Sequence, residues 1–219
     1  MKISRLITSL LFCAGCCAAA GQRPVGVAYY DVDRIYDTIP ALFYDDSDYT
    51  PEGRLRWTSA RYERKIRNTA AVIDSMALPI VALWGVENEQ VVRDLAAACK
   101  GDYSYLHRTL NSLDGMDFAL LYYGDLFYPV YDEPGRRYLY VEGELGRDTV
   151  GLVLCSDPRM ARWLIGDLRE ERPHAKLLVM GRTGSFFTTG SGLLDKTLRA
   201  EKAGRGNVRS TRKWQMRDR

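Results

Sequence analysis

The segment that most constrains the fold is the apolar run of residues 79–84, which is followed by the polar cluster Gly85-Val86-Glu87-Asn88. A short apolar run that is bounded by proline on one side and by polar residues on the other is typical of a buried strand. In α/β proteins, the carboxyl ends of such strands carry the groups that handle ligands. We therefore expect the rest of the chain to be arranged around this strand and its polar end.

Residues 1–20 have the pattern of a secretory signal peptide. Lys2 and Arg5 precede an apolar run over residues 6–14, and small residues follow it. The run is too short to cross a bilayer as a helix. We therefore predict that the protein is exported and that its folded part begins near residue 21.

Two cleavage sites fit this leader. Three alanines before Gly21 form an ordinary signal-peptidase site. Ala14-Gly15-Cys16 resembles a bacterial lipobox, in which Cys16 would be lipidated and would anchor the protein to a membrane, although Cys13 stands where leucine is usual. The two sites predict either a free periplasmic protein or an outer-membrane lipoprotein.

Residues 21–219 are sufficient for one large domain with a substantial core, and the hydrophobic fraction of 46% is ordinary for a globular protein. Three of the five cysteines lie in the leader. Cys99 and Cys155 then remain, which is too few for a disulfide framework, and their pairing stays open.

The net charge of +3 conceals an asymmetry. Residues 196–219 carry nine basic and two acidic side chains, whereas residues 21–195 carry 20 basic and 26 acidic ones. A basic tail can contact nucleic acid, but Trp214 is its one aromatic residue available for stacking. We favour a solvated or docked tail, so nucleic acid is not a predicted partner and a protein partner stays open.

The periodicity of the chain predicts a mixture of strands and helices without strict alternation. It shows no internal repeat and no linker, so we expect one domain, a layered α/β sandwich. The expected strands cover residues 25–30, 78–84, 118–123, 127–131, 137–141, 149–155 and 177–180, with a turn at 132–135, and the expected helices cover residues 58–73, 89–99, 157–172 and 193–203.

Several motifs follow one another in an order that resembles the endonuclease/exonuclease/phosphatase superfamily, the deoxyribonuclease-I-like fold, and specifically its exported bacterial branch. The resemblance implies two packed β-sheets flanked by helices. It extends to a late strand that begins near Trp214. The motifs are Tyr30-Asp31-Val32-Asp33, Thr50-Pro51-Glu52-Gly53, Arg56-Trp57-Thr58, Gly85-Val86-Glu87-Asn88 and Gly115-Met116-Asp117-Phe118.

Members of that superfamily bind Mg²⁺ or Mn²⁺ through oxygen ligands and hydrolyse phosphoesters. The resemblance places their functional positions on Asp31, Gly85, Asp117, Cys155, Arg182 and Gly184. Asp117 matches the family pattern, and Asp31 replaces an asparagine but could still bind a cation. Gly85 stands where the family has its metal-binding glutamate, and the neighbouring Glu87 matches a second glutamate.

The other positions depart further from the pattern. Cys155 lies where the family places histidine, Asp114 lies where an arginine is usual, and Gly181-Arg182-Thr183-Gly184 replaces Gly-Asp-Phe-Asn. The family's Ser-Asp-His segment would follow Arg219. The chain's histidines, His107 and His174, fall at no catalytic position, so we expect packed or surface side chains.

These departures favour a degenerate site, and therefore an inactive or strongly impaired enzyme that serves as a binding or scaffold module and needs no cofactor. The cleft is expected to be self-neutralised, because Arg182 would face the carboxylates, and Gly85→Glu with Arg182→Asp and Gly184→Asn would restore metal binding. One alternative is an active phosphoesterase with Mg²⁺ or Mn²⁺ at a rebuilt site of Asp31, Glu87 and Asp117. Another is a remnant of a longer hydrolase that lacks the last strands. The expected cleft residues are Asp31, Gly85, Glu87, Asp117, Cys155 and Arg182.

Overall fold

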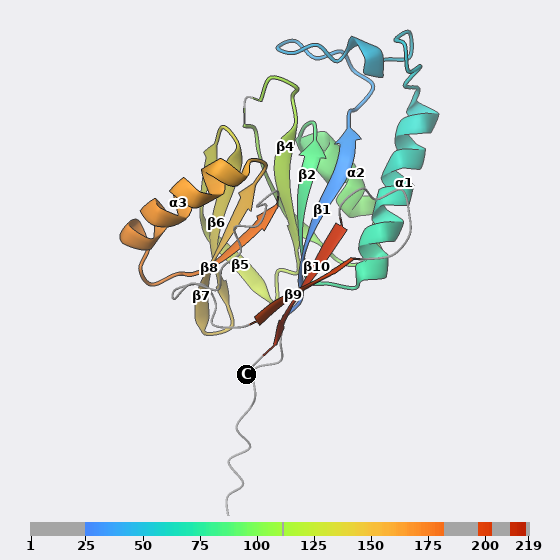
Figure 1. Cartoon of the computed structure of the whole chain (residues 1–219). Coiled ribbons are helices and arrows are strands. Elements are labelled where there is room, and N and C mark those ends of the chain that lie inside the picture. The colour runs from blue at the N-terminus through green and yellow to red at the C-terminus, as the bar shows by residue number, and fades with distance from the viewer. Residues whose placement is uncertain (1–24, 111, 182–196, 203–210, 218–219) are drawn as a thin grey trace, which may run out of the picture.

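Two β-sheets form the centre of the protein. The computed structural model describes residues 25–110, 112–181, 197–202 and 211–217 (Figure 1). The first sheet has the order β3 (Ser104–Arg108), β4 (Asp117–Tyr122), β2 (Ile80–Val86), β1 (Val27–Ile35), β10 (Thr211–Arg217) and β9 (Thr197–Lys202). The second has the order β5 (Phe127–Gly135), β6 (Tyr138–Leu145), β7 (Asp148–Cys155) and β8 (Lys176–Gly181).

Helices cover the outer faces of the two sheets. Figure 1 shows α1 (Ser59–Met76) and α2 (Glu89–Ala98) on the first sheet and α3 (Pro158–Glu171) on the second. The short helix η1 (Ser47–Tyr49) lies in the loop between β1 and α1. This arrangement confirms the predicted α/β sandwich. Among the described residues, no helix is long and apolar enough to span a membrane.

The central strands are apolar on both faces because both faces are covered. In β2, Ile80 and Ala82 face the core between the sheets, whereas Val81 and Leu83 face the core under α1 and α2. Successive side chains of a strand point to opposite faces, so a strand between two apolar layers has no polar face. A third cluster lies under α3 and contains Val153 and Cys155 of β7.

The helix boundaries follow their caps. The Asn88 side chain accepts a hydrogen bond from the Val91 amide at 3.0 Å, and Asp157 accepts one from the Arg159 amide at 2.9 Å before Pro158. Both interactions satisfy amides at a helix start that have no partner inside the helix. Thr58 occupies the predicted N-cap position of α1, although its side chain makes no capping hydrogen bond.

Two secondary-structure predictions are wrong. Residues 197–202 form strand β9 rather than part of a helix, because they pair with β10, as Ala200 does with Trp214. This tertiary pairing overrides a local helix preference. The predicted turn at residues 132–135 belongs to β5, and the chain turns at Arg136 and Arg137. Pro134 is tolerated there because β5 is an edge strand. Strand β10 confirms the late strand expected near Trp214.

The carboxyl ends of β1 and β2 are bent against each other. The two strands run parallel, and their register shifts between Asp31 and Ile35. Asp33 and Arg34 have φ values of 54° and 58°, and Gly85 has a φ of 95°. Such irregularities re-aim side chains where a strand ends. The bent ends of β1 and β2 form one wall of a cleft.

Candidate functional site

A cleft of about 440 Å³ lies where β1 and β2 end, between elements of both sheets. The first sheet contributes the end of β1, the end of β2 and the loop before β4. The second sheet contributes the β5–β6 turn and the residue after β7. The lining consists of Asp31, Asp33, Arg34, Trp84, Gly85, Ser112, Leu113, Asp114, Met116, Arg136, Arg137 and Ser156.

Two arginines form the contribution of the second sheet. Arg136 and Arg137 make up the two-residue turn between β5 and β6. The amide of Ser156 donates to the Arg137 carbonyl at 3.0 Å, which ties this turn to the end of β7. The guanidinium of Arg137 lies 3.7 Å from Asp157, whereas Arg136 makes no ion pair or hydrogen bond within the described part of the chain. The second sheet therefore presents positive charge to the cleft.

Three aspartates dominate the opposite side. The Asp31 carboxylate accepts a hydrogen bond from the Asp33 amide at 3.1 Å, within the bend at the end of β1. Asp114 pairs with Arg34 at 3.4 Å, and both side chains are about half exposed. The Tyr36 hydroxyl donates to the Asp114 carbonyl at 2.9 Å, which joins the loop before β4 to the end of β1. Acidic side chains therefore outnumber basic ones on the side of the first sheet.

Glu87 is buried behind the cleft instead of lining it. Its carboxylate accepts hydrogen bonds from the Asp37 amide at 2.6 Å and from the Tyr44 hydroxyl at 2.8 Å. Tyr44 also packs over Gly115, where an added Cβ would lie 2.4 Å from the ring. Burial raises the pKa of Glu87 to about 7, and the two hydrogen bonds offset part of that shift. Glu87 thus holds the loop after β1 against the end of β2.

The Glu87 contacts predict a pH-dependent stability. A carboxyl whose pKa is higher in the folded state than in the unfolded state binds more protons when folded, so stability falls as pH rises from about 4.5 to about 7. The loss across this window is expected to be about 2–3 kcal/mol. Urea unfolding at pH 4.5, 6 and 8 measures it. Glu87→Gln should flatten the profile, and an unchanged profile in that variant would assign the titration to another group.

Asp117 is also buried, and it is paired with His107. The Nε2 atom of His107 lies 3.0 Å from Asp117 Oδ2, and the two side chains are 7% and 3% exposed. The other oxygen, Oδ1, accepts from the Leu110 amide at 2.8 Å. His107 is therefore a packed histidine, as predicted. Its partner was not predicted from the sequence, because only the pairing of β3 with β4 brings the two side chains together.

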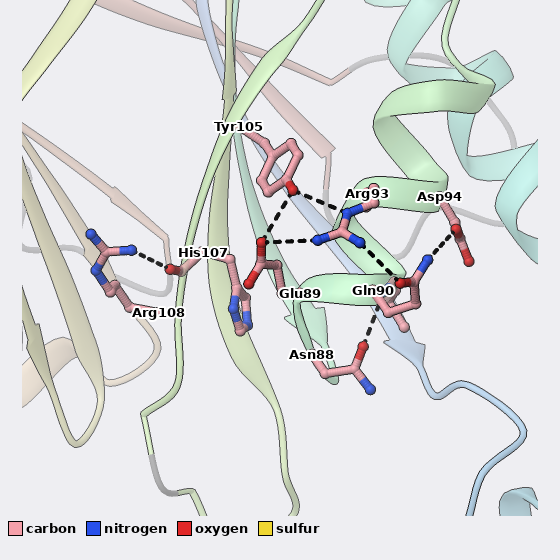
Figure 2. Close-up of polar contacts among 9 residues, drawn as sticks. Asn88, Glu89, Gln90, Arg93, Asp94, Tyr105, His107 and Arg108 are labelled. Carbon is pink, nitrogen blue, oxygen red and sulfur yellow. Dashed lines mark hydrogen bonds and ion pairs between the residues drawn. The ribbon is translucent and has the colours of Figure 1, made fainter.

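The surface near His107 has a polar network of its own. Figure 2 shows Arg93 of α2 between the Glu89 carboxylate at 3.4 Å and the Tyr105 hydroxyl at 3.3 Å. Arg108 joins the edge strands β3 and β5 by a bidentate ion pair with Asp132, in which both N···O distances are 2.7 Å. These contacts link α2, β3 and β5, and none of the residues that make them lines the cleft.

Of the remaining predicted positions, Cys155 and Gly85 are described by the structure, and neither supplies a catalytic group to the cleft. Cys155 is fully buried, and burial raises the pKa of its thiol to about 12, so it is not an accessible nucleophile. Gly85 does line the cleft, as predicted. Arg182 and Gly184 lie outside the described residues. Asp31 and Gly85 thus line the cleft, whereas Glu87, Asp117 and Cys155 do not line it.

The cleft residues that the structure describes do not form a ligand set for a divalent metal ion. In the described ranges, no three His, Cys, Asp or Glu side chains are grouped as ligands. Mg²⁺ requires several oxygen ligands in a near-octahedral shell. The oxygens of Glu87 and Asp117 already accept hydrogen bonds from the protein, and Arg34, Arg136 and Arg137 share the cleft with Asp31. Positive side chains disfavour a second cation nearby.

Comparison with known proteins shows the family of the chain. The model of the endonuclease/exonuclease/phosphatase family matches residues 26–156, which include all the residues that line the cleft. The chain belongs to this family. No curated protein matches the sequence.

Solved structures show the same fold at low sequence identity. A family protein from Bacteroides thetaiotaomicron has a TM-score of 0.54 and 12% identity, over 89% of this chain and 84% of that one. A mannosyl-6-phosphatase from Bacteroides thetaiotaomicron VPI-5482 has a TM-score of 0.53 and 12% identity, over 88% and 85%. Truncated TDP2 from Caenorhabditis elegans has a TM-score of 0.52 and 12% identity, over 88% and 84%.

Proposed function

We propose that the protein is an exported member of its family that has lost metal-dependent phosphoester hydrolysis and acts as a binding module at the cell envelope. One observation carries the proposal. The carboxylates of Glu87 and Asp117, at two family positions, are buried and hydrogen-bonded to the protein, so neither oxygen set is open to a metal ion. Phosphoryl transfer in this kind of site depends on a positioned metal ion that neutralises the phosphate charge. The described residues of the cleft provide arginines but no ligand set for such an ion.

Exposed apolar side chains, one of which lines the cleft, support a role in binding. Leu42, Phe43 and Leu113 are 89%, 94% and 87% exposed. The Ala41 amide donates to both oxygens of Asp46 at 3.1 Å, which closes the loop that carries Leu42 and Phe43. Ordered loops with exposed apolar side chains are typical of interaction sites.

A hydrolysis assay tests the loss of activity. Turnover of bis(p-nitrophenyl) phosphate by the purified protein is expected to stay at background with Mg²⁺, Mn²⁺ or Ca²⁺, and calorimetry should detect no binding of these ions at millimolar concentration. The reason is that the cleft has too few open oxygen ligands for such ions. Metal-dependent turnover that Asp31→Ala or Glu87→Gln abolishes would instead establish the rebuilt site of Asp31, Glu87 and Asp117.

The leader makes a separate prediction about export. If Cys16 becomes the mature N-terminus, cells that express the protein should incorporate labelled fatty acid into it, and Cys16→Ser should abolish the label. Mass spectrometry of the mature protein measures the same event. An unlabelled protein that begins at Gly21 would show ordinary signal-peptidase cleavage and a free exported protein.

A further inference from the structure

We propose that the cleft binds a small zwitterion that carries a phosphate group at one end and an ammonium group at the other, without a metal ion. This inference rests on the proposed function of the cleft as a binding site and specifies its ligand. The ligand would bring its own cation to the acidic side of the cleft, where the protein lacks the ligand set for a metal.

The charges of the lining are separated by sheet. The second sheet contributes Arg136 and Arg137 and no carboxylate. The first sheet contributes three aspartates, Asp31, Asp33 and Asp114, with Arg34 as its one basic residue. Formal charges therefore cancel over the whole cleft but leave an excess of positive charge on one side and of negative charge on the other. A ligand of a single sign would meet repulsion from one side, whereas a dipolar ligand can satisfy both.

The two arginines fit the phosphate end. They are consecutive residues of one turn, and the hydrogen bond from Ser156 to the Arg137 carbonyl holds that turn against β7. No described residue pairs with Arg136, and the Arg137 contact with Asp157 is long at 3.7 Å. Planar guanidinium groups bind phosphate through paired hydrogen bonds, which gives both strength and orientation. Ser156 lines the same part of the cleft, and its hydroxyl donates to the Arg137 carbonyl at 3.3 Å.

The opposite side fits the ammonium end. Asp31 and Asp33 lie in the bend at the end of β1, and Trp84 lines the cleft beside them. The Trp84 ring packs against Phe118 with ring centroids 4.5 Å apart, which holds it in place. An ammonium group is attracted both to carboxylates and to an indole face. It also tolerates an irregular set of contacts, unlike Mg²⁺, which requires a near-octahedral oxygen shell.

The volume fits a small organic ligand better than a lone ion. The cleft measures about 440 Å³, within the range of roughly 300–1,000 Å³ that is common for small-molecule sites. The side chains that would touch the ligand come from both sheets. A molecule that spans the cleft can therefore reach the β5–β6 turn and the end of β1 together.

Calorimetry with phosphoethanolamine tests the proposal, with EDTA present to remove metal ions. Phosphoethanolamine is expected to bind with a Kd below 1 mM, and inorganic phosphate and ethanolamine are each expected to bind at least tenfold more weakly. Arg136→Ala with Arg137→Ala should weaken binding at least tenfold, and Asp33→Asn should weaken it several-fold. Arg147→Ala is the matched control, because Arg147 is an exposed arginine in the turn at the opposite end of β6.

Each outcome decides the proposal. Three results would overturn the inference: no binding of phosphoethanolamine, phosphate binding of equal strength, or an equal loss of affinity in Arg147→Ala. None of them would contradict the proposed loss of hydrolysis, which the turnover assay tests separately. Cosedimentation with vesicles of phosphatidylethanolamine and phosphatidylglycerol, but not with phosphatidylglycerol alone, would support it and identify a lipid headgroup. Binding of the free compound without cosedimentation would support a soluble ligand. Binding that requires Mg²⁺ would contradict both this inference and the proposed function.

Discussion

Asp117→Ala is expected to lower the free energy of unfolding by about 3–5 kcal/mol, because it removes one partner from a buried pair. The substitution leaves the buried His107 ring without its carboxylate and the Leu110 amide without its acceptor. Urea unfolding followed by circular dichroism measures the change. Asp117→Asn should cost less, since its side-chain oxygen can still accept from Leu110.

Asp114→Ala is the matched control, because Asp114 lies three residues before Asp117, in the loop that leads into β4. Its ion pair with Arg34 is 3.4 Å long and about half exposed at both ends. Exposed pairs of this kind contribute about 1 kcal/mol or less. Equal losses in Asp114→Ala and Asp117→Ala would contradict a structural role for Asp117 and reopen a role for it in the cleft.

Gly85→Glu is expected to destabilise the protein by about 1–3 kcal/mol or more instead of restoring a metal site. Gly85 has a φ of 95°, which side chains of L-residues rarely adopt, and an added Cβ would lie 3.1 Å from the Arg34 amide nitrogen. The family glutamate therefore cannot be returned at this position without movement of the bend in β1. We expect no gain of Mg²⁺ binding in the variant, measured by calorimetry beside its unfolding curve.

Gly166→Glu is the control for the same chemical change. Gly166 lies on the exposed side of α3, where an added Cβ meets no atom within 4 Å, and its φ is not in the left-handed region. Replacing a glycine inside a helix by glutamate should stabilise it by up to about 1 kcal/mol. If Gly85→Glu were tolerated as well as Gly166→Glu, the local backbone would not be the reason for glycine at position 85.

The arginines that line the cleft are not the one that was predicted from the sequence. Carboxylates and arginines do meet in one cleft, as expected, but the described arginines are Arg34, Arg136 and Arg137. The predicted arginine, Arg182, lies outside the described residues. The sequence did not predict that Arg136 and Arg137 form a turn, because the expected turn at residues 132–135 left Arg136 between that turn and a strand that begins at Arg137. Their position follows from the longer ladder between β5 and β6.

The order of the motifs was sufficient to predict the family. The sandwich and its central strands were predictable because apolar runs of strand length and helix caps are local patterns. The sequence pattern also places Asp31 and Gly85 at the ends of two strands, and both residues line the cleft where the carboxyl ends of β1 and β2 meet. Long-range contacts determine which of the carboxylates are buried. Glu87 and Asp117 are as polar as Asp31 in sequence, but Tyr44 and His107 reach them from loops and strands distant in the chain. Burial and pairing depend on those long-range contacts, which no local pattern encodes.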